Sequence, residues 1–129
     1  YVCCLYATAP FVQQQDLLQG FELIQSKDLD YVFSATNYSF PIQRAIKIDS
    51  DGKVNMFSPE FFNTRSQDLE EAWHDAGQFY WGNAQAWIHK HAVFTPKSNI
   101  IPLPPHRVQD IDTLSDWHRA EMMASFLLK

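Results

Sequence analysis

Two aspartates near the C-terminal end, Asp110 and Asp112, have the residue type and spacing best suited to chemistry. The pattern predicts a strand over residues 107–112, and side chains two apart in a strand project from the same face. Ligands of open α/β sheets bind at the carboxyl edge of the strands. Magnesium is typically held by one or two carboxylates together with substrate phosphates, so the pair predicts metal-assisted phosphate chemistry. The alternative is that Asp112 caps the following helix and Asp110 is merely solvated.

Other reactive side chains form weaker patterns. His89 and His91 are two apart and face different directions on a helix, which favours solvated histidines over a shared zinc site. Cys3 and Cys4 are adjacent in a strand-like apolar run, where neighbouring side chains point to opposite faces and an intramolecular disulfide is improbable. Two such thiols, with no larger cysteine framework, favour a reducing, cytoplasmic compartment.

The composition of the chain bounds its class. It has 129 residues, of which 46% are apolar, 15% aromatic and 19% charged, and this suits one folded domain. No apolar run approaches the roughly eighteen residues of a membrane span. Ten Lys and Arg against fifteen Asp and Glu argue against nucleic acid as the main partner. The four glycines form no phosphate-cradling motif, and Tyr1 opens inside an apolar run, so we expect an N-terminal part to be missing.

The elements that must position these side chains alternate between strands and helices. Strands are predicted over residues 1–7, 31–36, 78–82 and 107–112, and helices over 13–27, 84–91 and 113–129. A hairpin is predicted for 45–49 and 54–57 around Asp51-Gly52, an edge strand or connector for 100–105, and an irregular excursion for 57–73. The unbroken apolar run of 1–7 is typical of a central strand covered on both faces. Together they predict one α/β domain with a mostly parallel sheet flanked by helices.

Three segments in this order carry a family resemblance. They are residues 5–11 (LYATAPF), residues 65–69 with 74–82 (RSQDL and HDAGQFYWG), and residues 109–117 (QDIDTLSDW). The chain resembles the acylneuraminate cytidylyltransferases, and among them the bacterial pseudaminic acid cytidylyltransferases, over essentially its whole length but only over their C-terminal portion. The resemblance implies a Rossmann-like nucleotide-sugar transferase fold. It also implies transfer of CMP from CTP to the 2-hydroxyl of a nine-carbon keto-sugar acid, with release of pyrophosphate.

The resemblance also implies roles for individual residues. Asp110 and Asp112 fall on the family's Mg²⁺-binding pair and would be catalytic. The sugar acid would contact Tyr6, Thr8, Gln78 and Tyr80, and the Arg65 guanidinium would bind its carboxylate. Residues 57–73 match a region that projects towards a second subunit, so a homodimer is implied. Tyr6 stands where the sialic acid enzymes carry glutamine, which favours pseudaminic acid.

Two other functions stay open on the sequence alone. The chain could be a truncated, non-catalytic α/β remnant that dimerises or binds a partner, because the family's triphosphate-holding loop does not occur in these residues. It could instead serve another keto-sugar acid, as a CMP-sialic acid synthetase does.

Overall fold

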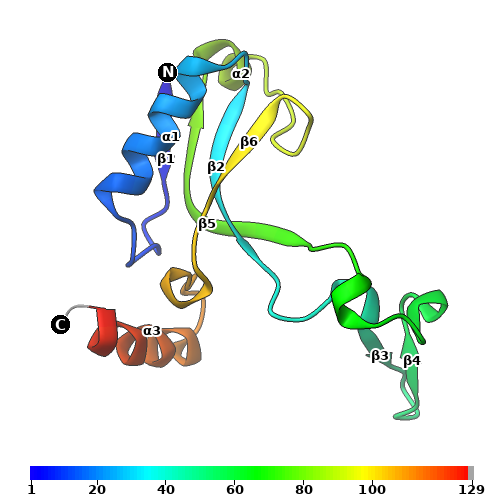
Figure 1. Cartoon of the computed structure of the whole chain (residues 1–129). Helices are drawn as coiled ribbons and strands as arrows, with labels where there is room; N and C mark the ends of the chain where they lie inside the picture. Colours follow the sequence, from blue (N-terminus) through cyan, green and yellow to red (C-terminus); the bar gives the residue numbers. More distant parts are fainter. Residues whose placement is uncertain (128–129) are drawn as a thin grey trace. The chain divides into compact units, whose positions relative to one another are not determined.

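A computed structural model describes residues 1–127 and divides them between two compact units. The first unit comprises Tyr1–Thr36 together with the chain from Asp75 onward, and the second comprises Asn37–His74. The strands are β1 Val2–Leu5, β2 Tyr31–Asn37, β3 Ile46–Ile48, β4 Val54–Met56, β5 Trp73–Gly82 and β6 Ser98–Pro102. The helices are α1 Gln14–Ser26, α2 Ala84–Ile88 and α3 Leu114–Leu127 (Figure 1). None of the helices in residues 1–127 has the length and apolar character needed to cross a lipid bilayer.

The main sheet has four strands in the order β1-β5-β2-β6. Strand β1 pairs antiparallel with β5, whereas β2 pairs parallel with β6 (Figure 1). The sheet is therefore mixed, and the expectation of a mostly parallel sheet is wrong. The succession of β1, α1 and β2 along the chain favours a parallel pairing of β1 with β2. It does not reveal that β5, a later strand, lies between β1 and β2 and separates them.

Strand β1 lies at the edge of this sheet, so the expectation that residues 1–7 form a central strand is wrong. Val2 is 51% exposed and Leu5 54% exposed, and the Cys4 side chain is exposed as well. Only Cys3 packs partly against the core. An unbroken apolar run indicates a strand that can be buried on both faces, but it does not specify whether that strand lies at the centre or at the edge of the sheet.

The core of the first unit lies between α1 and the sheet. Leu17, Phe21 and Ile24 recur at helical spacing, and they turn one face of α1 towards the strands. The cluster is built from fully buried Ile24, Val32 and Phe79, with Ala76, Ile101 and Leu103 beside them. The Trp81 indole N–H donates to the Leu17 carbonyl at 3.0 Å, which fixes the aromatic end of β5 to the helix. The predicted helix over 13–27 and the strand over 31–36 are confirmed.

The chain after β6 departs from the prediction. Residues 107–112 form no strand: a 3₁₀ turn at Pro105–Arg107 leads into irregular chain that ends at α3. Prolines at 102, 104 and 105 lack the N–H groups that a continuing ladder would require, so β6 ends at Pro102. Thr113 and Asp116 form a capping box at the start of α3, since the Asp116 N–H donates to Thr113 Oγ1 at 3.2 Å and the Thr113 N–H donates to Asp116 Oδ2 at 2.9 Å. Residues 128 and 129 of the predicted closing helix lie outside the described residues.

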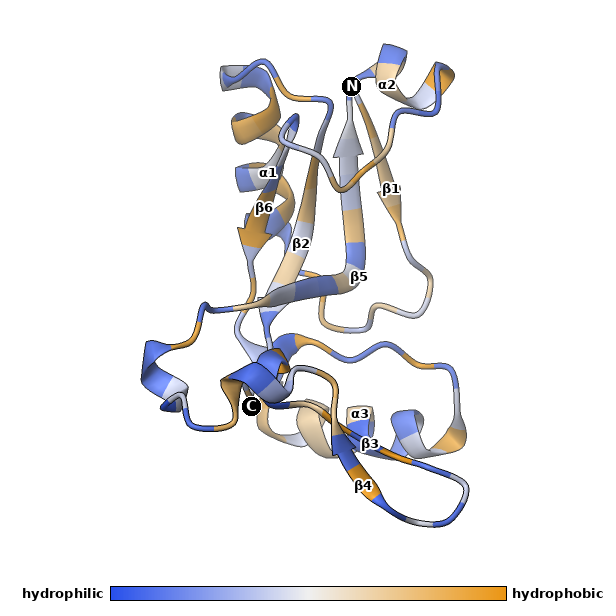
Figure 2. Ribbon diagram, turned by 90° about the vertical axis from the view of Figure 1, so that its right-hand side faces the viewer, coloured by the Kyte–Doolittle hydropathy of each residue, from blue (hydrophilic) through white to orange (hydrophobic). Residues whose placement is uncertain are grey.

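The second unit is built around the β3–β4 hairpin, as the Asp51-Gly52 pattern predicts. Gly52 adopts a φ of +77°, a left-handed conformation that glycine takes without steric cost. Apolar side chains of this unit are widely exposed, and Figure 2 shows hydrophobic and hydrophilic colouring mixed along β3 and β4. The most exposed are Phe40 at 82%, Ile48 at 68%, Phe62 at 66%, Phe57 at 64% and Val54 at 61%.

Candidate functional site

The candidate site is centred on Asp110, where the loop after β1 meets the irregular chain after β6. The Thr8 hydroxyl donates to Asp110 Oδ1 at 2.9 Å, across 102 residues of sequence. The Ile111 N–H donates to the same oxygen at 3.0 Å. Asp110 itself is exposed. Asp110 thus reaches the loop of residues 6–10, and irregular chain, not the predicted strand, carries the aspartate there.

Gly77, within β5, lies beneath this carboxylate. Its φ of +62° is in the left-handed region that favours glycine, and its N–H donates to Asp75 Oδ1 at 2.8 Å. A Cβ atom added at this position would lie 3.7 Å from Asp110 Oδ2 and 4.0 Å from the Tyr6 ring. Strand β5 therefore lies within van der Waals reach of both the aspartate and the tyrosine at Gly77, and the positive φ is what favours glycine at this position.

Two tyrosines lie beside the site, Tyr80 in β5 and Tyr6 in the loop after β1. The Tyr6 and Tyr80 rings are 5.4 Å apart between centroids and tilted by 46°. The Tyr80 hydroxyl donates to Asp75 Oδ2. Burial, reinforced by this bond to Asp75, raises the pKa of Tyr80 far above its ordinary value. Tyr80 is therefore a neutral phenol at every physiological pH and keeps its hydrogen on the Asp75 side.

Asp75 was not among the residues singled out from the sequence. It accepts from both Tyr80 and the Gly77 N–H and so joins the tyrosine pair to the left-handed glycine. The signal that could have found it is its position two residues before a glycine, because an aspartate there commonly accepts from the backbone of the second residue on.

Gln78, expected to contact the sugar acid, is 1% exposed. Its side-chain amide donates to the Arg107 carbonyl at 2.6 Å, and its backbone N–H donates to the Ser34 hydroxyl at 3.2 Å. Its Oε1 has no hydrogen-bond partner within the part of the chain that the structure describes. In this structure Gln78 thus ties β5 to the segment that leads to Asp110.

The remaining two predicted site residues are both exposed. The Asp112 N–H donates to Asp116 Oδ2 at 3.4 Å at the start of α3. Arg65 belongs to the second unit, where its Nε donates to Asp68 Oδ2 at 3.0 Å. The prediction that one strand face carries both Asp110 and Asp112 is wrong, because residues 107–112 form no strand.

The donor chemistry of Asp110 and Asp112 still suits magnesium. Both supply carboxylate oxygens, and Mg²⁺ binds one or two carboxylates while keeping positions for water and substrate phosphates. Within residues 1–127, no group of three or more His, Cys, Asp or Glu side chains is placed to hold a metal. A cation at this pair would therefore depend on phosphate oxygens for its remaining ligands.

Comparison with known proteins identifies the relatives of this chain. It is 41% identical over 123 residues, or 95% of its length, to proteins named pseudaminic acid cytidylyltransferase in two strains of Campylobacter jejuni, serotypes O:2 and O:23/36. It is 36% identical over 110 residues to a Helicobacter pylori protein named pseudaminic acid cytidylyltransferase and UDP-2,4-diacetamido-2,4,6-trideoxy-β-L-altropyranose hydrolase.

The matches differ in how much of each relative they cover. The chain spans about half the length of the Campylobacter relatives (53%) and 21% of the Helicobacter protein. No family model matches the chain. Nearly all of this chain is nevertheless homologous to pseudaminic acid cytidylyltransferases, which confirms the resemblance noted in its sequence.

Proposed function

We propose that the protein transfers CMP from CTP to a nonulosonic acid, with pseudaminic acid as the favoured acceptor, and releases pyrophosphate. Such a product would serve the synthesis of bacterial surface glycans. The observation that carries the proposal is the carboxylate of Asp110, anchored by Thr8 over the bare Cα of Gly77. The 41% identity to relatives of that name over 95% of the chain supports it.

The proposed metal site consists of Asp110 and Asp112. Bound Mg²⁺ would offset the charge of the CTP phosphates. The chain's own contribution is the orientation of the Asp110 carboxylate. Thr8 and the Ile111 N–H both donate to Oδ1, so rotation of the carboxylate is restrained.

The proposed sugar pocket uses the tyrosines beside this carboxylate. Tyr6 and Thr8 are exposed and lie on the loop that reaches Asp110, and Tyr80 packs against Tyr6. The Asp75 bond holds the Tyr80 ring in one orientation. Arg65 is proposed to bind the sugar carboxylate, because a guanidinium forms two parallel hydrogen bonds with a carboxylate. Gln78 is proposed to act from behind the pocket, through Arg107, because it is buried.

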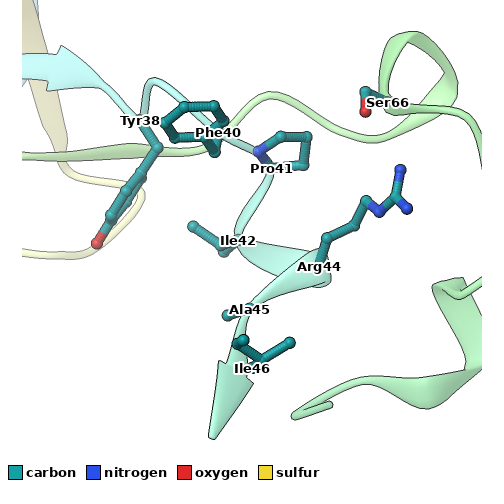
Figure 3. Close-up of a pocket in the computed structure, with 8 residues that line it drawn as sticks. All are labelled: Tyr38, Phe40, Pro41, Ile42, Arg44, Ala45, Ile46 and Ser66. Atoms are coloured by element: carbon teal, nitrogen blue, oxygen red, sulfur yellow. The ribbon is translucent and has the colours of Figure 1, made fainter. Parts of the chain in front are cut away.

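We propose a homodimer, with self-association through the second unit. Residues 57–73 expose Phe57, Phe62 and Trp73, and the hairpin adds Ile48 and Val54. A two-stranded hairpin is at best marginally stable by itself, so this unit gains from a partner surface. It also carries an apolar groove of about 530 Å³ (Figure 3), lined by Tyr38, Phe40, Pro41, Ile42, Arg44, Ala45, Ile46 and Ser66. Large exposed apolar surfaces commonly mark interfaces.

The dimer is tested by sedimentation equilibrium of wild type and a Phe62→Ser variant. We expect wild type to sediment as a dimer and Phe62→Ser to dissociate at lower concentrations. Met122→Gln is the matched control, because Met122 is exposed to a similar extent (63%, against 66% for Phe62) but belongs to α3. A monomeric wild type, or equal behaviour of the two variants, would contradict an interface at this unit.

The activity is tested by measuring pyrophosphate release with CTP, Mg²⁺ and a panel of nonulosonic acids. We expect release to require a sugar acid and to be fastest with pseudaminic acid. Faster release with sialic acid would favour a CMP-sialic acid synthetase. A folded dimer that releases no pyrophosphate with any acid would favour the non-catalytic alternative.

A further inference from the structure

A buried ion pair joins α1 to the 3₁₀ turn before Asp110. Asp16, in the first turn of α1, is 7% exposed, and the side chain of Arg107 is 13% exposed. The guanidinium donates twice, from Nη1 to Asp16 Oδ2 at 2.7 Å and from Nη2 to Asp16 Oδ1 at 3.3 Å. A two-pronged bond of this kind fixes the angle as well as the distance between its partners. It therefore orients the turn against the helix.

A second bond ties the same turn to the sheet. The Arg107 carbonyl accepts from the Gln78 side chain at 2.6 Å, and Gln78 is 1% exposed. Arg107 is thus held at its guanidinium by α1 and at its carbonyl by β5. Beyond it, the Gln109 amide donates to the Asp110 carbonyl at 2.7 Å. These bonds replace the strand ladder that residues 107–112 lack.

The three residues that make these bonds are each close in sequence to a part of the candidate site. Arg107 precedes Asp110 by three residues, and Gln78 directly follows Gly77. Asp16 lies in the first turn of the helix that follows the Thr8 loop. We infer that Asp16, Arg107 and Gln78 form a positioning clamp that sets the Asp110 carboxylate against Thr8 and over Gly77. Its importance for catalysis rests on the proposed function, whereas its geometric role does not.

The clamp also has an electrostatic consequence. Arg107 carries a permanent positive charge three residues from the Asp110 carboxylate. Both prongs of the guanidinium are occupied by Asp16, so this cation is neutralised where it lies. The Asp110 carboxylate has its own partners, Thr8 and the Ile111 N–H.

The clamp is tested by NMR on the 129-residue protein without any substrate. Arg107→Lys keeps the charge but loses the planar fork. We expect it to displace the backbone amide signals of Thr8, Gly77 and Ile111. We also expect it to speed hydrogen exchange of the Ile111 N–H roughly tenfold or more, because its acceptor Asp110 is no longer held in place. Arg65→Lys is the matched control, since Arg65 also pairs with an aspartate, but on an exposed surface.

A second variant, Gln78→Met, tests the same inference if Arg107→Lys does not fold. Gln78→Met keeps the volume and the ion pair but removes the donor to the Arg107 carbonyl, and we expect it to displace the same three amide signals. If either variant folds, loses stability and leaves these signals and the Ile111 exchange rate unchanged, the residues are merely structural and the inference is overturned. Because no CTP or sugar acid is present, this outcome is independent of the outcome of the pyrophosphate assay.

Discussion

Replacing Gly77 by alanine tests the geometry beneath Asp110. The new Cβ would meet Asp110 Oδ2 at 3.7 Å, Asp110 Cγ at 3.8 Å and the Tyr6 ring at 4.0 Å, which are ordinary van der Waals distances. Steric overlap therefore contributes little to the cost. The backbone contributes most, since a non-glycine residue in the left-handed region costs about 1–2 kcal/mol. Reduced freedom of the unfolded chain offsets about 0.4–1 kcal/mol of that.

The expected result is a folded Gly77→Ala protein that loses about 1 kcal/mol of unfolding free energy in urea. Pyrophosphate release should fall far more than stability does, because the methyl group would lie within 4 Å of both the Asp110 carboxylate and the Tyr6 ring. Gly52→Ala is the matched control: its φ is +77° and a Cβ there would meet nothing within 4 Å. It should cost a similar free energy and leave activity unchanged.

Two results would refute this reasoning. A loss above about 3 kcal/mol for Gly77→Ala alone would show that contacts, and not backbone strain, dominate the cost. Equal activity of Gly77→Ala and Gly52→Ala would show that the reaction does not use the space over Gly77.

Three further predictions concern folding. Phe79→Ala should destabilise the protein by about 3–5 kcal/mol in urea unfolding, because the ring is fully buried. Thr113→Ala should cost about 1 kcal/mol and lower the helicity measured by circular dichroism, because the Asp116 N–H loses its acceptor. The hydrogen bond with His91 lowers the pKa of Asp30, so its stabilising contribution is present above the unfolded pKa and is lost as pH falls through the folded pKa. Asp30→Asn should flatten the acid limb of the stability curve measured below about pH 4.

The parts of the fold that the sequence predicted are those governed by local patterns. The apolar spacing of Leu17, Phe21 and Ile24 predicted α1, and Asp51-Gly52 predicted the hairpin. Strand order was not predictable in this way. The place of β5 between β1 and β2 depends on pairings between distant segments, and neither neighbour's sequence encodes it.

In the candidate site too, residues marked by a local pattern were predicted and contacts between distant residues were not. Asp110 was predicted from residue type and family resemblance, although the strand over residues 107–112 on which its pairing with Asp112 depended does not form. Asp16 and Arg107 are 91 residues apart, and no periodic pattern links them. Such a buried pair is apparent only when tertiary structure brings the two side chains together.

The most direct test of the central claim is the rate of pyrophosphate release after replacement of the two carboxylates. Asp110→Asn and Asp112→Asn keep the size of each side chain and remove the charge that Mg²⁺ requires. With CTP, Mg²⁺ and pseudaminic acid, each variant should lose roughly 100-fold or more in rate while its circular dichroism matches wild type. Asp28→Asn, at an exposed carboxylate that pairs with Lys97, is the control and should be as active as wild type. Wild-type rates for folded Asp110→Asn and Asp112→Asn would contradict the claim that these carboxylates form the catalytic site.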